Sequence, residues 1–582
     1  MPAGPQTAAA FTYRPYAPPR PEHTRRPPTP ALSERIAAAS ERGVIGKALA
    51  TAGVAVTLIG VALLLVLAAQ AGILRPEFRV AGGAALALGL VGAGVWLQRK
   101  TDGRVGAIAL AATGIAAGYL DVLAVTRIYE WLPIVGGLSA AALVAAGGLV
   151  LARLWNSEHL GLLVAVPLMV LAPALTGGLD MTLVAFMIIL CAASFWVQVG
   201  RDWIWLHTVR MAAPTLPLTA IAVAGVFGPD LDWRFAVATM SVIALGLGGA
   251  VILTHHSRFG PLLALIASVT TVPLMIGGAA LDLPLGPALQ AGTALLFVAL
   301  ALGAHTLPSG SDTMGQIWTA TAAVLTLIAV QVAFDDDVAV AVLLGIAVIA
   351  GTLGRRSASR IPAALVAATV FWLIGLSSLL SELPPVALAT YSLVDRVATP
   401  SSLAASVLLA AGAVVLASGW QRHVVRTVGV GSNQEDQVRN LGRVVWSGAA
   451  LIAVYALTAL CVAAGVLVAG PDGFLGGHVL ATVCWVAVAA GTLVYARHRS
   501  GGHRNAVIAG GLILIVGAML KLFLFDLATL DGVFRVIVFM IVGLALLGLG
   551  AWYARALQGD SVPGDSVLGA PGDPAQGPSA PA

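Results

Sequence analysis

The sequence predicts an all-α, polytopic helical membrane bundle with about eighteen transmembrane helices of roughly 20 residues each. Three observations indicate it. Hydrophobic residues make up 59% of the 582 residues and charged residues only 10%, whereas a soluble domain carries about 25% charged residues. The apolar residues come in blocks long enough to cross a bilayer. The blocks are also continuous, as at 54–69 and 536–552, whereas barrel strands alternate apolar and polar positions.

The two ends of the chain differ from its apolar middle. Residues 1–43 are rich in Pro and Arg. They predict a disordered cytoplasmic segment, because such a stretch buries too little apolar surface to offset its ordering entropy. Residues 558–582 are rich in Gly, Pro, Ser and Asp, and a disordered tail is expected there. Residues 44–557 form the expected multi-pass transmembrane domain.

The expected spans follow one another with short linkers. They lie near residues 46–70, 78–97, 105–125, 132–153, 159–176, 181–199, 207–227, 234–254, 259–280, 286–305, 314–333, 338–354, 361–380, 401–420, 443–469, 477–496, 505–526 and 533–556.

The charges in the linkers predict the orientation. With a cytoplasmic N-terminus, about 25 of the 32 Lys and Arg fall in inside segments. The outside turns are acidic, as at Asp180, Asp472 and residues 335–337. Because positive charge resists translocation, we expect both termini to be cytoplasmic. The arginines are spread over short turns where they meet anionic lipid headgroups. Membrane lipids are therefore expected partners and nucleic acid is not, since a nucleic-acid groove clusters its basic residues.

The first and last hairpins of the expected bundle suggest parallel helical-hairpin repeats. Glu77–Val80 begins the second span and Val533–Val536 begins the last, and from there the two helices align without gaps, with Trp96 matching Trp552. Each hairpin would start inside, turn outside and return, so the repeats would be parallel units of roughly 50 residues. Chance matching between Gly- and Ala-rich helices is the alternative.

The closing hairpin resembles a known family. The segment Lys521–Arg535 reads KLFLFDLATLDGVFR and looks like the closing signature of a bacterial family of multi-pass membrane proteins, domain of unknown function 2339. Gly46-Lys47, Gly114–Leu120 and Thr126–Tyr129 resemble the same family near its start, whereas Val166–Pro173 departs from the Gly-Phe-rich stretch expected there. The resemblance implies a bacterial cytoplasmic (inner) membrane protein. It implies no activity.

The strongest candidate site is a polar network at the outer face, formed by Lys521, Asp526, Asp531 and Arg535. Ionisable groups inside a membrane cost about 2.5–3.5 kcal/mol each at a helix centre, so they are functional candidates by default. The functional interpretation is a site that holds an anionic group or gates a path. The structural alternative is a snorkelling Lys521 beside a charge-paired turn.

A secondary candidate combines Tyr119, Asp121 and Arg127. Asp121 lies about one turn inside its apolar block, and Arg127 is the partner that we expect for it. An interface ion pair is the alternative to a functional site.

Five prolines fall inside expected spans. They are Pro167, Pro173, Pro214, Pro217 and Pro273. Proline removes a backbone donor, and interrupted helices at corresponding places in repeated units point to a transport site. Ordinary kinks are the alternative, because proline is common in membrane helices.

No catalytic residue, cofactor site or metal site is expected, because no His, Cys or acidic cluster has suitable spacing. We therefore expect a protein that is not an enzyme, and a transporter-like or lipid- and envelope-precursor-handling function. A structural or assembly scaffold is the alternative, with residues 1–43 docking a protein partner. A polytopic sugar transferase, using the acids at 335–337 and 230–232, is a weaker alternative. The sequence does not indicate the substrate.

Overall fold

The computed structural model describes residues 75–100, 104–282, 284–355, 362–428, 432–496, 502–523, 536, 539–544 and 547–548. Regular secondary structure in these residues is helical, apart from an isolated β-bridge between Leu231 and Leu281. Among the described residues, 14 helices are long and apolar enough to cross a membrane. The prediction of an all-α polytopic bundle is confirmed. The number eighteen stays a prediction, because the first and last expected spans lie wholly or largely outside the described residues.

The two expected disordered ends, 1–43 and 558–582, also lie outside the described residues. So do Arg535 and Trp552, the markers of the proposed repeat in the last hairpin. The two disordered ends and the hairpin repeat therefore stay predictions.

The chain divides into two compact units, Met1–Leu132 and Pro133–Ala582. The helices described in the first unit are α3 (Pro76–Gln98), α4 (Arg104–Leu123) and the π-helical turn η1 (Ala124–Ile128).

Small residues bring α3 and α4 together. A Cβ atom added to Gly94 would lie 2.9 Å from the carbonyl oxygen of Ala107, and one added to Gly114 would lie 2.6 Å from that of Ala87. Side chains of this size let helix backbones approach closely in a membrane, where packing and not hydrophobicity drives association.

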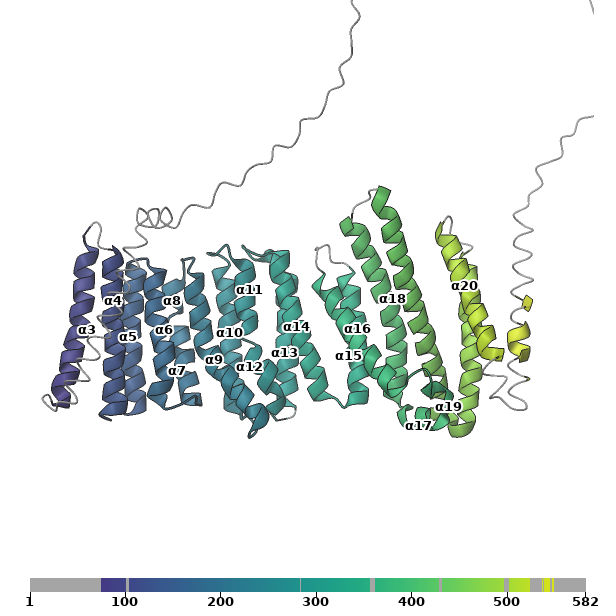
Figure 1. The fold of residues 1–582 in the computed structure, drawn as a ribbon, viewed down its shortest axis with the longest axis horizontal. Helices are drawn as coiled ribbons and strands as arrows, with labels where there is room; N and C mark the ends of the chain where they lie inside the picture. Colours follow the sequence, from purple (N-terminus) through teal and green to yellow (C-terminus); the bar gives the residue numbers. More distant parts are fainter. Residues whose placement is uncertain are drawn as a thin grey trace, which may run out of the picture. The chain divides into compact units, whose positions relative to one another are not determined.

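The second unit contains the remaining described helices, which stand side by side and roughly parallel (Figure 1). They are α5 (Ile134–Leu154), α6 (Glu158–Thr176), α7 (Met181–Ala193), α8 (Phe195–Gln198), α9 (Ile204–Phe227), α10 (Trp233–Leu253), α11 (Gly260–Val269), α12 (Val272–Gly277), η2 (Gly278–Ala280), α13 (Leu285–Gly303), η3 (Ala304–Thr306), α14 (Asp312–Ala333), α15 (Asp336–Gly354), α16 (Ala363–Glu382), η4 (Ala387–Ala389), α17 (Tyr391–Val397), α18 (Pro400–Val428), α19 (Ser432–Ala496) and α20 (Gly502–Lys521).

Polar side chains at the turns begin several of these helices. The Ser157 hydroxyl accepts from the amide of Leu160 at the start of α6, and the Asp180 carboxylate accepts from the amide of Leu183 at the start of α7. Such caps satisfy backbone donors that have no partner within the helix. Asp180 therefore defines the start of a helix in addition to making its turn acidic.

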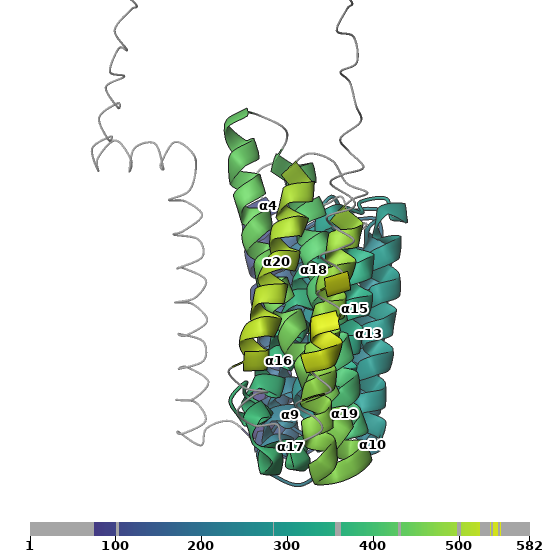
Figure 2. The same ribbon diagram turned by 90° about the vertical axis from the view of Figure 1, so that its right-hand side faces the viewer.

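The long helix α19 consists of two arms. Its 65 residues would extend about 100 Å at 1.5 Å per residue, far beyond a hydrocarbon core of about 30 Å. Ala469 and Gly470 have non-helical backbone angles, and Gly470 has a positive φ of 58°. The chain turns back there, and α18, α19 and α20 run side by side (Figure 2). Two separate spans were expected here, near 443–469 and 477–496.

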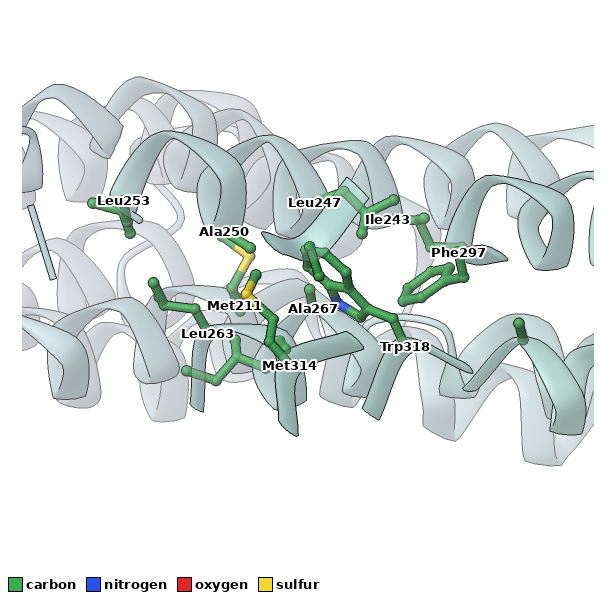
Figure 3. Packing of buried hydrophobic residues seen from close by; sticks show 14 of the residues in the cluster. Met211, Ile243, Leu247, Ala250, Leu253, Leu263, Ala267, Phe297, Met314 and Trp318 are labelled. Atoms are coloured by element: carbon green, nitrogen blue, oxygen red, sulfur yellow. The ribbon is translucent and has the colours of Figure 1, made fainter. Parts of the chain in front are cut away.

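One buried cluster of the second unit joins α9, α10, α11, α13 and α14. Trp318 of α14 and Phe297 of α13 are fully buried members of this cluster (Figure 3). Met211, one residue after the arginine described below, packs in the same cluster beside Ala250 (Figure 3). The first two turns of α9 therefore pack against α10 through this cluster.

Candidate functional site

Arg210 is a cation buried within the apolar helix α9. It lies six residues after the first residue of that helix and has 6% of its surface exposed. An arginine guanidinium stays protonated in proteins, and a charge inside a membrane span is costly unless it has partners. The neighbours of Arg210 therefore decide what this residue does.

The start of α9 is fixed by a side chain from α6. Glu158 accepts hydrogen bonds from the backbone amides of Trp205 at 2.8 Å and Leu206 at 3.1 Å. A carboxylate at a helix N-terminus satisfies unpaired donors and suits the helix dipole. This contact sets the register of α9, and so of Arg210, against α6.

His207 is the hydrogen-bond partner of Arg210. Nη2 of Arg210 lies 2.9 Å from Nδ1 of the fully buried His207. Because a guanidinium can only donate, Nδ1 must accept and the imidazole is neutral, with its proton on Nε2. Gly249 of α10 makes room for the ring, since a Cβ atom there would lie 3.0 Å from Cε1 of His207.

The other contacts of Arg210 are also with uncharged groups. The guanidinium lies 4.7 Å from the ring centroid of Phe195, within cation–π range. It also interacts with the thiol of the buried Cys191. Arg210 forms no ion pair with an acid among the described residues. Its Nε and Nη1 atoms have no hydrogen-bond partner in that part of the chain.

An apolar cleft opens beside Arg210, between α5, α6, α7 and α9. It encloses a volume of about 40 Å³. Its walls include Met169, Met187, Leu190 and Ala213, and Arg210 is the one charged residue among the described residues that line it. Several lining side chains, including those of Leu190 and Ala213, are only half-buried, so the cleft is not sealed from the surface of the helices.

A polar groove lies one helical turn away. It has a volume of about 540 Å³ and is lined by Arg153, Asn156, Arg201, Trp203 and their neighbours. Arg153 of α5 donates from Nη1 to the carbonyls of Trp196 and Val197, both at 2.7 Å. Leu149 of the cleft and Arg153 of the groove are four residues apart on α5, so the groove adjoins the cleft at the ends of the same helices.

Lys521 points into the bundle, between α19 and α20. Its Nζ donates to the Thr482 hydroxyl at 2.7 Å and to the His478 carbonyl at 3.1 Å. Thr482 is fully buried and His478 is 3% exposed. The expected partners Asp526, Asp531 and Arg535 lie outside the described residues, so the predicted network stays a prediction. Sequence reasoning missed Thr482 and His478, although they are four residues apart and so share a helix face.

The secondary candidate is spread over different surfaces of α4 and η1. Tyr119 is buried, whereas Arg127 is exposed on η1. The Asp121 carboxylate faces α3, where a Cβ atom on Gly83 would lie 2.7 Å from Oδ1. Asp121 and Arg127 form no ion pair between them in the described structure: the Asp121 carboxylate faces α3, and Arg127 is exposed.

Proline has different effects in the three helices that contain it. Pro167 and Pro173 lie inside the continuous α6, and Pro214 and Pro217 inside the continuous α9. Pro273 follows a break, because α11 ends at Val269 and α12 begins at Val272. Only this last span is interrupted among the three.

The described residues bring together no three His, Cys, Asp or Glu side chains in an arrangement that would hold a metal ion. Sequence reasoning missed the Arg210 site. The available signal was the spacing of His207 and Arg210, three residues apart on one helix face within an apolar block.

The fold and this site define a class: a polytopic α-helical membrane protein with a buried cation between its helices. The chain belongs to the family described as predicted membrane protein (DUF2339), whose sequence model matches residues 46–376 and 210–556. The resemblance found in the sequence is thus confirmed. Neither the curated proteins nor the solved structures include a match.

Proposed function

We propose that this protein handles an amphiphilic molecule within the membrane, as a transporter or as a protein that handles lipids or envelope precursors. The cleft between α5, α6, α7 and α9 is the observation that supports it. Its walls are apolar, with Arg210 as the charged residue of the lining. Ligand sites typically combine apolar walls with a few polar groups that fix orientation. A molecule with an apolar chain and a polar end matches the chemistry of this lining.

The proposal includes no chemical step and no cofactor. The acids considered for a sugar transferase have structural uses: Asp232 caps α10 through the amides of Arg234 and Phe235, and Asp336 and Asp337 lie in the first turn of α15, where the helix dipole favours them. These uses support a binding or transport protein over an enzyme.

Binding is tested by purifying the tagged protein in a mild detergent and identifying co-purifying lipids and proteins by mass spectrometry. Ala213→Leu narrows the cleft, because Ala213 lines it. Ala220→Leu adds the same side chain at an exposed position of the same helix. We expect one class of amphiphile to co-purify with the wild type and with Ala220→Leu, and less of it with Ala213→Leu. Equal amounts in all three would contradict the proposal, and protein partners without an amphiphile would favour the scaffold alternative.

Orientation is part of the proposal: both termini on the cytoplasmic side of a bacterial inner membrane, with residues 1–43 accessible to a cytoplasmic partner. The arginine-rich linkers support it. Reporter fusions after residues 100 and 500 should be cytoplasmic, and fusions near Asp180 and Asp336 external. An external reading at either terminus would overturn this orientation.

A further inference from the structure

The charge of Arg210 is not balanced by any of the described residues around it. The groups in contact with its guanidinium are His207, Phe195 and Cys191, and the hydrogen bond to His207 requires a neutral imidazole. A thiol is a weak acceptor. An arginine that is only 6% exposed, with Nε and Nη1 unpartnered among the described residues, is arranged to receive an anion from outside the described chain.

The space beside Arg210 limits the size of that anion. A cavity needs about 10–15 Å³ to hold one water molecule, so the enclosed 40 Å³ takes about three water-sized groups. The free oxygens of a phosphate group fit this space, whereas the rest of the ligand, including the chain of a lipid, has to extend along the open part of the cleft. Arginine suits phosphate because its planar guanidinium offers several donors and is weakly hydrated.

The groove next to the cleft favours an anionic ligand as well. Arg153 and Arg201 line it, and their guanidinium groups lie over Trp196 and Trp203. Asp202 of the same groove pairs with Arg258 at 3.8 Å, so the acid is itself balanced by a cation. Positive potential at the mouth of a site raises the local concentration of anions.

We propose that Arg210 binds the phosphate group of a ligand in the cleft, with Arg153 and Arg201 attracting it at the adjoining groove. This inference rests on the proposed function, because it names the polar end of the amphiphile. The phosphate can belong to a lipid headgroup or be free inorganic phosphate. The chemistry at Arg210 is the same for both.

The test measures thermal stability of the delipidated, full-length protein in detergent against three added probes. The probes are phosphatidylglycerol, a diacylglycerol with the same two chains but no phosphate, and inorganic phosphate. The variants are Arg210→Gln and the matched control Arg234→Gln, which removes a charge from a side chain that is 66% exposed. Phosphatidylglycerol should stabilise the wild type and Arg234→Gln, and diacylglycerol should do so much less. Arg210→Gln should weaken the phosphatidylglycerol affinity about ten- to a hundredfold, the cost of losing charge-assisted hydrogen bonds.

Each outcome separates this inference from the proposed function. Stabilisation by inorganic phosphate alone, lost in Arg210→Gln, supports phosphate recognition but contradicts an amphiphile. Equal stabilisation by both lipids, unchanged in Arg210→Gln, overturns the inference that Arg210 binds phosphate. The proposal that the protein handles an amphiphile then still stands. If none of the three probes stabilises the protein, both the phosphate inference and the proposed function are overturned. If Arg210→Gln does not fold, Arg210→Lys keeps the charge with fewer donors, and its phosphatidylglycerol affinity should still fall. An unchanged affinity in Arg210→Lys overturns the inference.

Discussion

Arg210 and Lys521 both lie in helices of the second unit, and the surroundings of the two cations differ. Lys521 donates to a buried hydroxyl and to a backbone carbonyl, both on the second arm of α19. Arg210 donates to His207, but its Nε and Nη1 atoms have no partner among the described residues. The first cation is held by the helix that it packs against, and the second faces a cleft.

The difference separates a structural role from a binding role. A buried cation whose donors are used by neighbouring helices contributes to folding, because removing it leaves its partners unsatisfied. A buried cation with unused donors over a cavity lowers the stability of the empty protein and raises its affinity for an anion. Functional residues often carry such a cost in stability. The predictions below test whether the two cations divide in this way.

The largest effect is expected from Lys521→Ala. This change removes hydrogen bonds to Thr482 and to the His478 carbonyl, and hydrogen bonds to charged groups contribute about 1.5–3 kcal/mol each. The free energy of unfolding should fall by about 2 kcal/mol, since only part of that is realised in membrane proteins. Thermal or chemical unfolding in detergent measures it. Leu520→Ala, at an exposed neighbouring position, is the control. Equal stability of the two variants would show that Lys521 only snorkels.

A smaller effect is expected from Thr482→Val. The change keeps the shape of the side chain but removes the hydroxyl that accepts from Lys521 at 2.7 Å. The expected loss is about 1 kcal/mol. With Lys521→Ala in the same protein, the two losses should not add, and a coupling of at least roughly 0.5 kcal/mol is expected for groups in contact. Additive losses would mean that the two side chains do not stabilise each other.

The sequence predicted the fold class well, because block length and continuity depend only on the solvent that surrounds the helices. It did not predict which proline would interrupt a span. Before Pro273, the hydroxyls of Thr270 and Thr271 donate to the carbonyls of Ala267 and Ser268. These bonds satisfy backbone groups at the break. Inside α6 and α9, by contrast, the helix continues through its prolines. Whether a helix continues through a proline depends on its packing against other helices, and the neighbouring sequence does not reveal that packing.

The candidate site was harder to predict than the fold. Lys521 was found because it is a rare lysine near the end of an apolar block. Arg210 was missed because an arginine six residues into a span reads as an interfacial topology signal. Its guanidinium contacts Cys191 of α7 and Phe195 of α8, and Gly249 of α10 leaves space for its partner His207. These contacts are distant in sequence, so single-sequence reasoning does not reveal them.

The smallest effect on stability is expected from Arg210→Gln in lipid-free detergent. The substitution removes a buried charge that no acid balances among the described residues, which favours folding. The glutamine amide can still donate toward His207, which limits the loss of that hydrogen bond. The two contributions oppose each other, and the free energy of unfolding should change by less than about 0.5 kcal/mol. Side-by-side unfolding of Arg210→Gln and Lys521→Ala in the same detergent measures the contrast. A loss in Arg210→Gln as large as that in Lys521→Ala would make both cations structural, and the distinction between the two regions would then fail.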